Sequence, residues 1–320
     1  MITCQTRENI TRLVSLDPRP RFSISQISTL PQSFADDVRG YAEAGVDAIG
    51  VWELKLGDGP DDAALEQLTA SGLGSASAVP AVPSVLPLPL LPGPDDPRER
   101  VEALCASVRR LEAFAPSAIV CLTGPGPEDA RATVVDGLRT VAAEAERAGM
   151  RLALEPFQRE GIEQWSMVNT LGDAAALIDE IGSPAVGIQF DVWHLWNTPA
   201  LFEEIAEHAG LIAGVHVNDY REPTRGWADR VLPGDGVAPV PEILAALEAA
   251  GWDGWYDLEI FSDDGAFGSA YPDSLWDVPG AELARRGRAA FERCWAARPR
   301  HDFSPMTGGP TSVAPAAADE

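Results

Sequence analysis

Four acidic or histidine side chains follow short apolar segments between residues 150 and 260. Each segment has the composition of a buried strand, and its polar residue stands near the carboxyl end. These residues are Glu155, Asp191, His216 and Glu259. In α/β proteins the carboxyl ends of strands display functional groups, so the four side chains are candidates for one shared site.

A shared site of this composition predicts a divalent cation. Three carboxylates in one buried place would repel each other, and their burial is costly unless a cation balances the charge. One nitrogen and three oxygen ligands suit Mn²⁺, Co²⁺ or Mg²⁺ better than a thiolate-rich structural zinc site does, and Zn²⁺ is also compatible. Any one of these residues alone would more often be a salt-bridged or hydrogen-bonded core group. The prediction therefore depends on all four standing at equivalent positions.

The elements that must position these residues alternate between strand and helix patterns. Strands are predicted at 21–29, 47–54, 74–82, 118–123, 151–157, 187–194, 211–218 and 254–261. Helices are predicted at 31–44, 61–72, 97–114, 128–148, 171–181, 199–209, 239–250 and 279–297. Eight such units over roughly 280 residues indicate a closed (β/α)₈ TIM barrel. The alternative, a doubly wound open sheet, would need a glycine-rich turn after the first strand, where the chain has Ser25-Gln26-Ile27-Ser28.

The predicted domain organisation is one catalytic barrel at 21–297 between two terminal segments. Residues 1–20 form a lead-in, and the Pro-, Gly-, Ser- and Ala-containing segment 298–320 is predicted to be a disordered tail. The proline-rich stretch 79–97 can be neither a regular helix nor a central strand. Its interleaved valines and leucines are too apolar for a solvated linker, so we predict a packed loop that forms one wall of a pocket.

The composition of the chain argues against some classes of binding partner. The chain has 320 residues and a formal net charge of −25, which repels nucleic-acid backbones and anionic lipids. We expect neither nucleic acid nor a membrane as a partner. The four cysteines are scattered without a CxxC pair, which is typical of reduced thiols. The chain start has no apolar signal segment, and no apolar run has the length of a membrane span. We expect a soluble, cytoplasmic protein.

Four segments carry a resemblance to a known family. The segments LALEPF, GIQFDVWH, GVHVND and LEIF, together with RVLPGDG, resemble the xylose isomerase-like TIM-barrel superfamily, the sugar phosphate isomerase/epimerase group, over about residues 21–297. The resemblance implies one divalent metal, often manganese, at Glu155, Asp191, His216 and Glu259. It also implies that the two glutamates act as the catalytic acid/base pair. His194 would contact a substrate oxygen, and Arg230 would reach the substrate. Homo-oligomers are common in the family.

The resulting expectation is a metal-dependent keto-sugar or inosose isomerase or epimerase that acts through an enediolate, on a carbohydrate or cyclitol substrate. A lyase on the same scaffold is the alternative: an inosose or 3-dehydroshikimate dehydratase, or an enzyme that eliminates from a 3-oxo-glycoside. A nuclease of the same fold would need a histidine-rich cluster and a basic face, and the chain has only four histidines. A non-catalytic sugar-binding protein would not need both glutamates. Glu222 stands where some ketohexose epimerases carry an arginine, which disfavours that branch.

Several further residues are weaker candidates. Gln26 and Trp52 end the first two strands and are predicted to contact substrate. The alternative for Gln26 is a hydrogen-bonded amide at the barrel rim, and the alternative for Trp52 is a packing role. Trp165, Trp193 and Trp196 are candidates for an apolar wall against a sugar ring. Asp219 could orient either a loop or a ligand.

Overall fold

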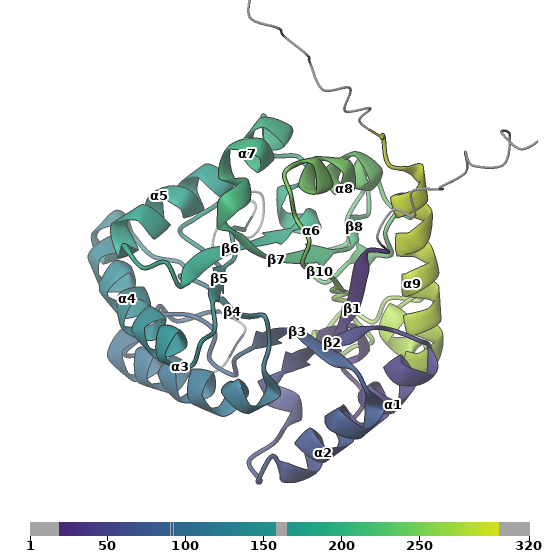
Figure 1. Cartoon of the computed structure of the whole chain (residues 1–320), viewed down its shortest axis with the longest axis horizontal. Coiled ribbons are helices and arrows are strands. Elements are labelled where there is room, and N and C mark those ends of the chain that lie inside the picture. Colours follow the sequence, from purple (N-terminus) through teal and green to yellow (C-terminus); the bar gives the residue numbers. More distant parts are fainter. Residues whose placement is uncertain (1–18, 90, 92, 158–164, 301–320) are drawn as a thin grey trace, which may run out of the picture.

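Eight parallel strands form a closed barrel at the centre of the molecule (Figure 1). The computed structural model describes residues 19–89, 91, 93–157 and 165–300. Around the barrel the strands follow the order β1-β10-β7-β6-β5-β4-β3-β2. Their bounds are β1 Arg21–Ser25, β2 Ala48–Trp52, β3 Gly74–Val79, β4 Ala118–Cys121, β5 Leu152–Leu154, β6 Val186–Asp191, β7 Ile212–Val217 and β10 Trp255–Leu258. The predicted (β/α)₈ barrel is confirmed, and the open doubly wound sheet is excluded.

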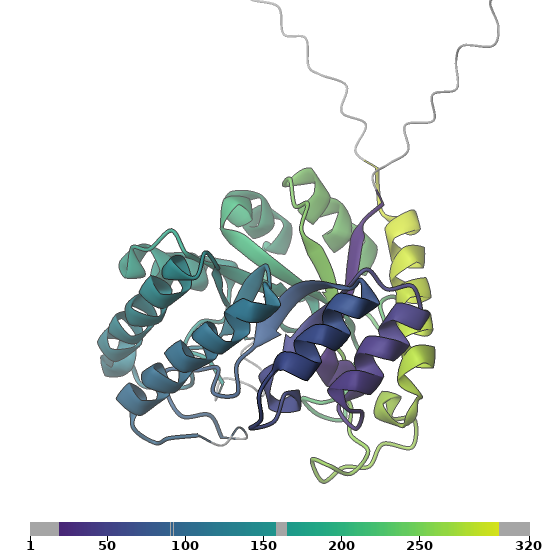
Figure 2. The ribbon, with the colours of Figure 1, turned by 60° about the horizontal axis from the view of Figure 1, so that its bottom comes forward.

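Helices surround the barrel, as the side view also shows (Figure 2). They are α1 Phe34–Glu43, α2 Asp62–Ser71, α3 Pro97–Leu111, α4 Arg131–Arg147, α5 Leu171–Ile181, α7 Leu201–His208, α8 Val240–Ala249 and α9 Gly280–Ala297. Local chemistry sets several of their ends. Asp96 accepts a hydrogen bond from the Arg98 amide in front of α3, Thr170 caps α5, and Gly182 ends α5 in the left-handed conformation. None of the described helices is both long and apolar enough to cross a lipid bilayer.

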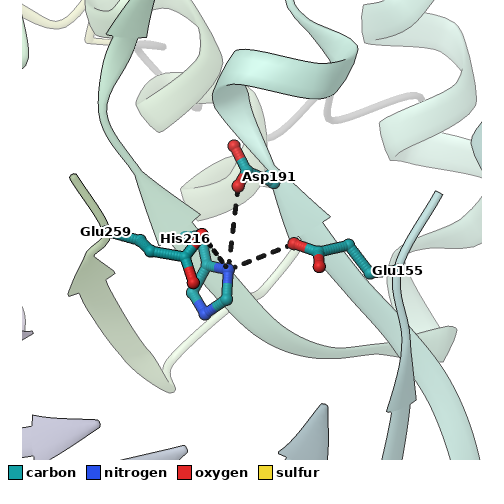
Figure 3. Close-up of side chains that lie close together, drawn as sticks. All are labelled: Glu155, Asp191, His216 and Glu259. Carbon is teal, nitrogen blue, oxygen red and sulfur yellow. Dashed lines mark hydrogen bonds and ion pairs between the residues drawn. The ribbon is translucent and has the colours of Figure 1, made fainter. Parts of the chain in front are cut away.

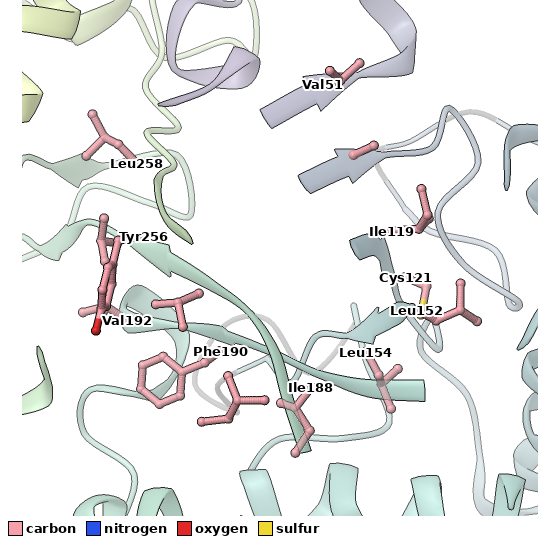
Figure 4. Close-up of a cluster of buried hydrophobic side chains, with 14 of the residues drawn as sticks. Val51, Ile119, Cys121, Leu152, Leu154, Ile188, Phe190, Val192, Tyr256 and Leu258 are labelled. Atoms are coloured by element: carbon pink, nitrogen blue, oxygen red, sulfur yellow. The ribbon is translucent and has the colours of Figure 1, made fainter. Parts of the chain in front are cut away.

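The main core lies between the strands and the helices. Outward-facing strand residues such as Val51, Ile119, Leu152 and Ile188 are fully buried there (Figure 4). The barrel interior below the strand ends is more polar. Asp257 accepts hydrogen bonds from Ser23 Oγ at 2.9 Å and from Ser77 Oγ at 2.7 Å. Burial raises the pKa of this carboxyl to about 6.

Three short elements at the barrel mouth depart from the predicted pattern. The strand predicted over 187–194 ends at Asp191 and continues as a helix, and two short strands follow β7. The helix α6 (Val192–Leu195) follows β6 directly, and Asp191 caps it by accepting from the Trp193 amide at 2.7 Å. The strands β8 (Asp219–Tyr220) and β9 (Arg230–Val231) pair antiparallel after β7. This pairing folds the intervening loop back, so that Arg230 returns to the mouth.

Several predicted boundaries differ from the structure, and two of the differences change the role of a side chain. The first strand ends at Ser25, and Gln26–Thr29 forms a 3-10 turn whose polar side chains bond inside the protein. Arg298 does not belong to a disordered tail, because its side chain is buried against Trp295 and forms an ion pair with Glu248 at 2.7 Å. The rest of the predicted tail from residue 301, and the lead-in up to residue 18, lie outside the described residues.

The proline-rich stretch packs as a loop, as predicted. Val85, Leu86 and Leu88 are buried, and the Val85 and Leu86 amides donate to backbone carbonyls of residues 122 and 123 after β4. The cysteines among the described residues are buried and unpaired, in agreement with the predicted reduced thiols.

Candidate metal and substrate site

The four predicted ligands converge at the carboxyl ends of β5, β6, β7 and β10 (Figure 3). His216 Nδ1 lies 3.2 Å from Glu155 Oε1 and 3.3 Å from Glu259 Oε2. The same nitrogen lies 3.7 Å from Asp191 Oδ2. All four side chains are buried, and their donor atoms lie within 4.8 Å of one another.

This spacing fits a divalent cation. Donor atoms placed tetrahedrally at about 2.1 Å from a cation are roughly 3.4 Å apart, which is close to the separations around His216 Nδ1. Three carboxylates so close together in a buried place need a positive charge among them. The donor set of one imidazole nitrogen and three carboxylate oxygens could therefore hold one divalent metal ion.

Hydrogen bonds orient the Asp191 carboxylate within this cluster. Its Oδ1 accepts from the Trp193 amide at 2.7 Å and from Asn218 Nδ2 at 3.0 Å. Asn218 Nδ2 also donates to the Glu259 backbone carbonyl at 3.2 Å, which ties β7 to β10. The other carboxylate oxygen, Asp191 Oδ2, faces His216. Asn218 thus positions two of the cluster's residues, a role that the sequence alone did not indicate.

Arg230 enters the cluster from β9. Its Nη1 donates to Asp191 Oδ2 and to Glu259 Oε2, each at 2.7 Å. The guanidinium carbon lies 5.3 Å from the Trp193 ring centroid and 4.7 Å from that of Phe261, so both rings hold the side chain in place. Arg230 is therefore at the predicted site.

His194 stands beside this arginine. Arg230 Nη2 lies 3.3 Å from His194 Nε2, and because an arginine only donates, Nε2 accepts and the proton resides on Nδ1. Nδ1 itself has no hydrogen-bond partner among the described residues. Burial lowers the pKa of His194 to about 3, so the ring is neutral at pH 7.

The carboxylates have contrasting electrostatic environments. Burial raises the pKa of Glu155 to about 7. Burial also opposes ionisation of Asp191, but the charges of Arg230 and of the His216 imidazolium outweigh it and hold the pKa of Asp191 well below its usual range. Burial disfavours the imidazolium of His216, yet Glu259 and Asp191 outweigh this effect and raise its pKa well above the usual value. Glu155 is thus the acid whose protonation state is most finely balanced near pH 7.

A cavity opens directly above the cluster. It offers ≈ 490 Å³ of space when its open mouth is included. Its lining residues are Trp52, Leu91, Leu122, Glu155, Phe157, Trp165, His194, Trp227, Arg230, Glu259 and Phe261. Leu91 belongs to the proline-rich loop, which therefore does form part of a pocket wall.

Some of the weaker candidates line the cavity and others do not. Trp52 and Trp165 line it. Gln26 is not among its lining residues: its Nε2 donates to Asp37 and its Oε1 accepts from the Trp52 amide, so both ends of its amide are already engaged inside the protein. Trp193 packs edge-on against His194, below the cavity, and Trp196 packs against Tyr220.

Three aromatic residues of the lining were missed. Phe157 and Phe261 each stand two residues after an inward-facing glutamate, so strand alternation could have indicated them. Trp227 lies in the irregular loop between β8 and β9, where no sequence pattern points to the cavity.

Asp219 orients a loop rather than a ligand. Its carboxylate accepts hydrogen bonds from four backbone amides: Tyr220, Gly234, Gly236 and Ala238. These bonds fold the segment that follows Arg230. The nearby basic residues Arg221 and Arg225 form ion pairs with Asp229 and Asp273.

Comparisons with known proteins agree with this geometry. The model of the xylose isomerase-like TIM barrel family matches residues 38–294. Hydroxypyruvate isomerase of Escherichia coli K12 is 26% identical over 175 residues, which cover 53% of this chain and 64% of that protein. D-psicose 3-epimerase of Enterocloster bolteae is 30% identical over 179 residues, covering 54% of each chain. The match thus spans less than two thirds of either relative.

A solved structure from Sinorhizobium meliloti 1021 is similar over most of its length. It is 27% identical, with a TM-score of 0.74, and the alignment covers 86% of this chain and 98% of that one.

Proposed function

Because the chain belongs to the xylose isomerase-like TIM barrel family, we propose that it is a divalent-metal-dependent isomerase or epimerase of keto-sugars or inososes. The single observation that carries the proposal is the convergence of three carboxylates on His216 Nδ1. Relatives with isomerase and epimerase activity support the reaction class. Mn²⁺ is our first candidate for the metal, and Co²⁺, Mg²⁺ or Zn²⁺ also suit the ligands.

A cation held by the cluster would act as a Lewis acid and increase the acidity of the C–H next to a substrate carbonyl. Glu155 and Glu259 both line the cavity and are placed to move the proton. Return of the proton to the opposite face gives epimerisation, and return to the neighbouring carbon gives isomerisation.

The remaining polar residues of the cavity would orient the substrate. His194 is neutral and can offer the Nδ1 proton to a substrate oxygen. Arg230 holds Asp191 and Glu259 in place and remains within the cavity lining. The aromatic residues around them restrict the access of bulk water to the cluster.

The substrate would be a small carbohydrate or cyclitol, and we propose a cytoplasmic location from composition alone. A homo-oligomer is also proposed, on the basis of the family resemblance. Sedimentation equilibrium tests the assembly independently of activity.

The direct test is solvent-proton exchange in D₂O. Hydroxypyruvate, D-psicose and an inosose are incubated with the Mn²⁺-loaded protein, and deuterium incorporation next to the carbonyl is followed by NMR. We expect incorporation that EDTA abolishes and added Mn²⁺ restores. Glu155→Gln and Glu259→Gln should each slow it by about 10²–10⁴-fold. Glu180→Gln, an acid that pairs with Arg131 on the surface, is the matched control and should not change the rate.

Turnover that survives EDTA or both glutamine substitutions would contradict the proposal. Loss of water with formation of an enone or diketone, in place of simple exchange, would assign the site to the lyase alternative.

A further inference from the structure

The aromatic residues at the cavity form a continuous chain of ring contacts. Phe157 lies over His194 with centroids 3.9 Å apart and stacks on Trp165 at 6.0 Å with an interplanar angle of 7°. Trp165 contacts Trp227 at 5.6 Å. Trp227 contacts Phe261 at 5.6 Å, and Phe261 contacts Trp52 at 5.9 Å. The chain therefore begins beside His194, at the polar cluster, and ends at β2. We call these five rings, Phe157, Trp165, Trp227, Phe261 and Trp52, the aromatic wall.

The aromatic wall surrounds the cavity and does not lie on one side of it. Trp52 ends β2, Phe157 and Trp165 follow β5, Trp227 comes from the loop between β8 and β9, and Phe261 follows β10. Leu122 after β4 and Leu91 from the proline-rich loop continue the same apolar lining. Elements around much of the barrel circumference thus present carbon surface to the same space.

Polar groups among the described lining residues are confined to the cluster. They are Glu155, Glu259, His194 and Arg230, which all lie at or beside the metal ligands. The two other arginines of the β8–β9 loop pair with acids outside the cavity. One end of the cavity is therefore suited to a chelating carbonyl and hydroxyl, and the described surface beyond it is apolar.

A hydroxylated ring is poorly matched to the apolar part. A sugar ring offers C–H patches to one or two aromatic faces, but its equatorial hydroxyls radiate from the edge and need hydrogen-bond partners. Apolar surface on several sides would leave those hydroxyls unpaired at a cost. A flat apolar group, by contrast, can meet aromatic faces and edges from several directions at once.

We propose that the carbohydrate or cyclitol substrate carries, next to the α-hydroxy-carbonyl unit bound at the cluster, an aryl or similarly flat apolar substituent that is enclosed by the aromatic wall. The inference rests on the proposed function for the orientation of the chelating end. The wall extends outward beyond the cavity, because Trp227 also contacts Phe267 at 4.8 Å and Phe267 is 42% exposed. A group longer than one ring would still find apolar contact there.

Two small α-hydroxy-ketones test the proposal because they differ only in the apolar group. Hydroxyacetone carries a methyl group on the carbonyl, and 2-hydroxyacetophenone carries a phenyl ring. Their dissociation constants are measured by NMR titration on the Mn²⁺-loaded protein and again after EDTA treatment. We expect the phenyl compound to bind at least about tenfold more tightly, which is the effect of burying one aromatic side chain's worth of carbon surface.

Variants of the wall residues test whether the preference for the phenyl compound arises at the aromatic wall. Trp227→Ala and Trp165→Ala should each reduce the phenyl-to-methyl ratio by about threefold or more, because each removes one face of the enclosure. Phe202→Ala is the matched control: this exposed aromatic residue of α7 lies outside the cavity, and its loss should leave the ratio unchanged. Circular dichroism verifies that each variant is folded. If only one of the two tryptophan variants folds, that variant alone is enough for the test.

Equal affinities for the two compounds, or no binding of the phenyl compound up to about 10 mM, would overturn the inference. A preference that survives both tryptophan substitutions would also overturn it. The two proposals fail separately. Phenyl preference without metal-dependent exchange of the α-protons would refute the isomerase assignment but support the apolar binding site at the aromatic wall. Exchange without phenyl preference would support the isomerase assignment but refute that binding site.

Discussion

Arg230 bridges Asp191 and Glu259, two predicted metal ligands that arrive on different strands. Its Nη1 donates to one oxygen of each carboxylate at 2.7 Å, and all three side chains are buried. One guanidinium therefore links the carboxylates at the ends of β6 and β10 and compensates part of the cluster's negative charge. Removal of one partner from such a buried arrangement leaves uncompensated charge.

Arg230→Met should consequently lower the free energy of unfolding of the metal-free protein by about 3–5 kcal/mol. Saturating Mn²⁺ should reduce this difference, because the cation then compensates the same carboxylates. Urea unfolding with and without Mn²⁺ measures both values. Arg225→Met, in which the lost pairs lie nearer the surface, should cost about 1 kcal/mol or less and show no such metal dependence. An equal loss of stability for Arg230→Met in both conditions would contradict the role of the cation.

Metal binding should depend on pH in a way that reflects Glu155. Its pKa in the metal-free protein is raised to about 7 by burial, so below that pH the carboxyl holds a proton that the metal must displace. Apparent Mn²⁺ affinity should therefore fall more steeply with decreasing pH below about 7 than above it. Calorimetric titration from pH 6 to pH 8 measures the slope. Glu155→Gln should bind Mn²⁺ more weakly and should lose the steeper pH dependence below about pH 7. A constant slope in the unmodified protein would argue against a Glu155 pKa of about 7.

Asp219 should be essential for the loop that carries Arg230. In Asp219→Asn one oxygen that accepts two backbone amides becomes an NH₂ donor facing them. We expect a loss of about 2–3 kcal/mol in the free energy of unfolding. Faster amide hydrogen exchange at Gly234 and Gly236 should accompany it. Asp235→Asn, an exposed turn residue in the same loop, should cost less than about 0.5 kcal/mol. Unchanged exchange at both glycines would refute this role.

The packing of the proline-rich loop can be tested at Gly124. This residue has φ of 73°, and a Cβ added there would lie 2.4 Å from the Leu86 carbonyl oxygen. Gly124→Ala should therefore lower stability by about 2–4 kcal/mol, from left-handed strain and backbone overlap together. Gly182→Ala has a similar φ of 70° but its nearest contact is at 3.9 Å, so only the strain, about 1–2 kcal/mol, should remain. Equal costs in denaturant unfolding would show that the loop can move away.

The sequence predicted the four ligands because two simple rules place them. Apolar strands alternate with amphipathic helices, and in that topology the carboxyl ends of successive strands meet at one face. Glu155, Asp191, His216 and Glu259 follow from those rules once the strands are recognised. The short pair β8 and β9 escaped prediction because two-residue strands have no periodicity.

Side-chain partners were less accessible to sequence reasoning. Gln26 stands at a strand end as a substrate contact would, but Asp37 and the Trp52 backbone use its amide. Which partner an amide chooses depends on packing that no local pattern encodes. Trp227 reaches the cavity because the irregular loop between β8 and β9 folds back over the mouth, and no local sequence pattern encodes the path of such a loop.

Equilibrium metal binding tests the central claim most directly. The protein is stripped with EDTA, dialysed against Mn²⁺, and its metal content is measured by elemental analysis alongside His216→Ala and Asp191→Ala. One equivalent of Mn²⁺ per chain in the unmodified protein, and at least about a tenfold loss of affinity in each variant, is the predicted result. Failure of the folded, unmodified protein to bind Mn²⁺, Co²⁺, Mg²⁺ or Zn²⁺, or binding that both variants retain, would contradict a metal centre at this barrel mouth.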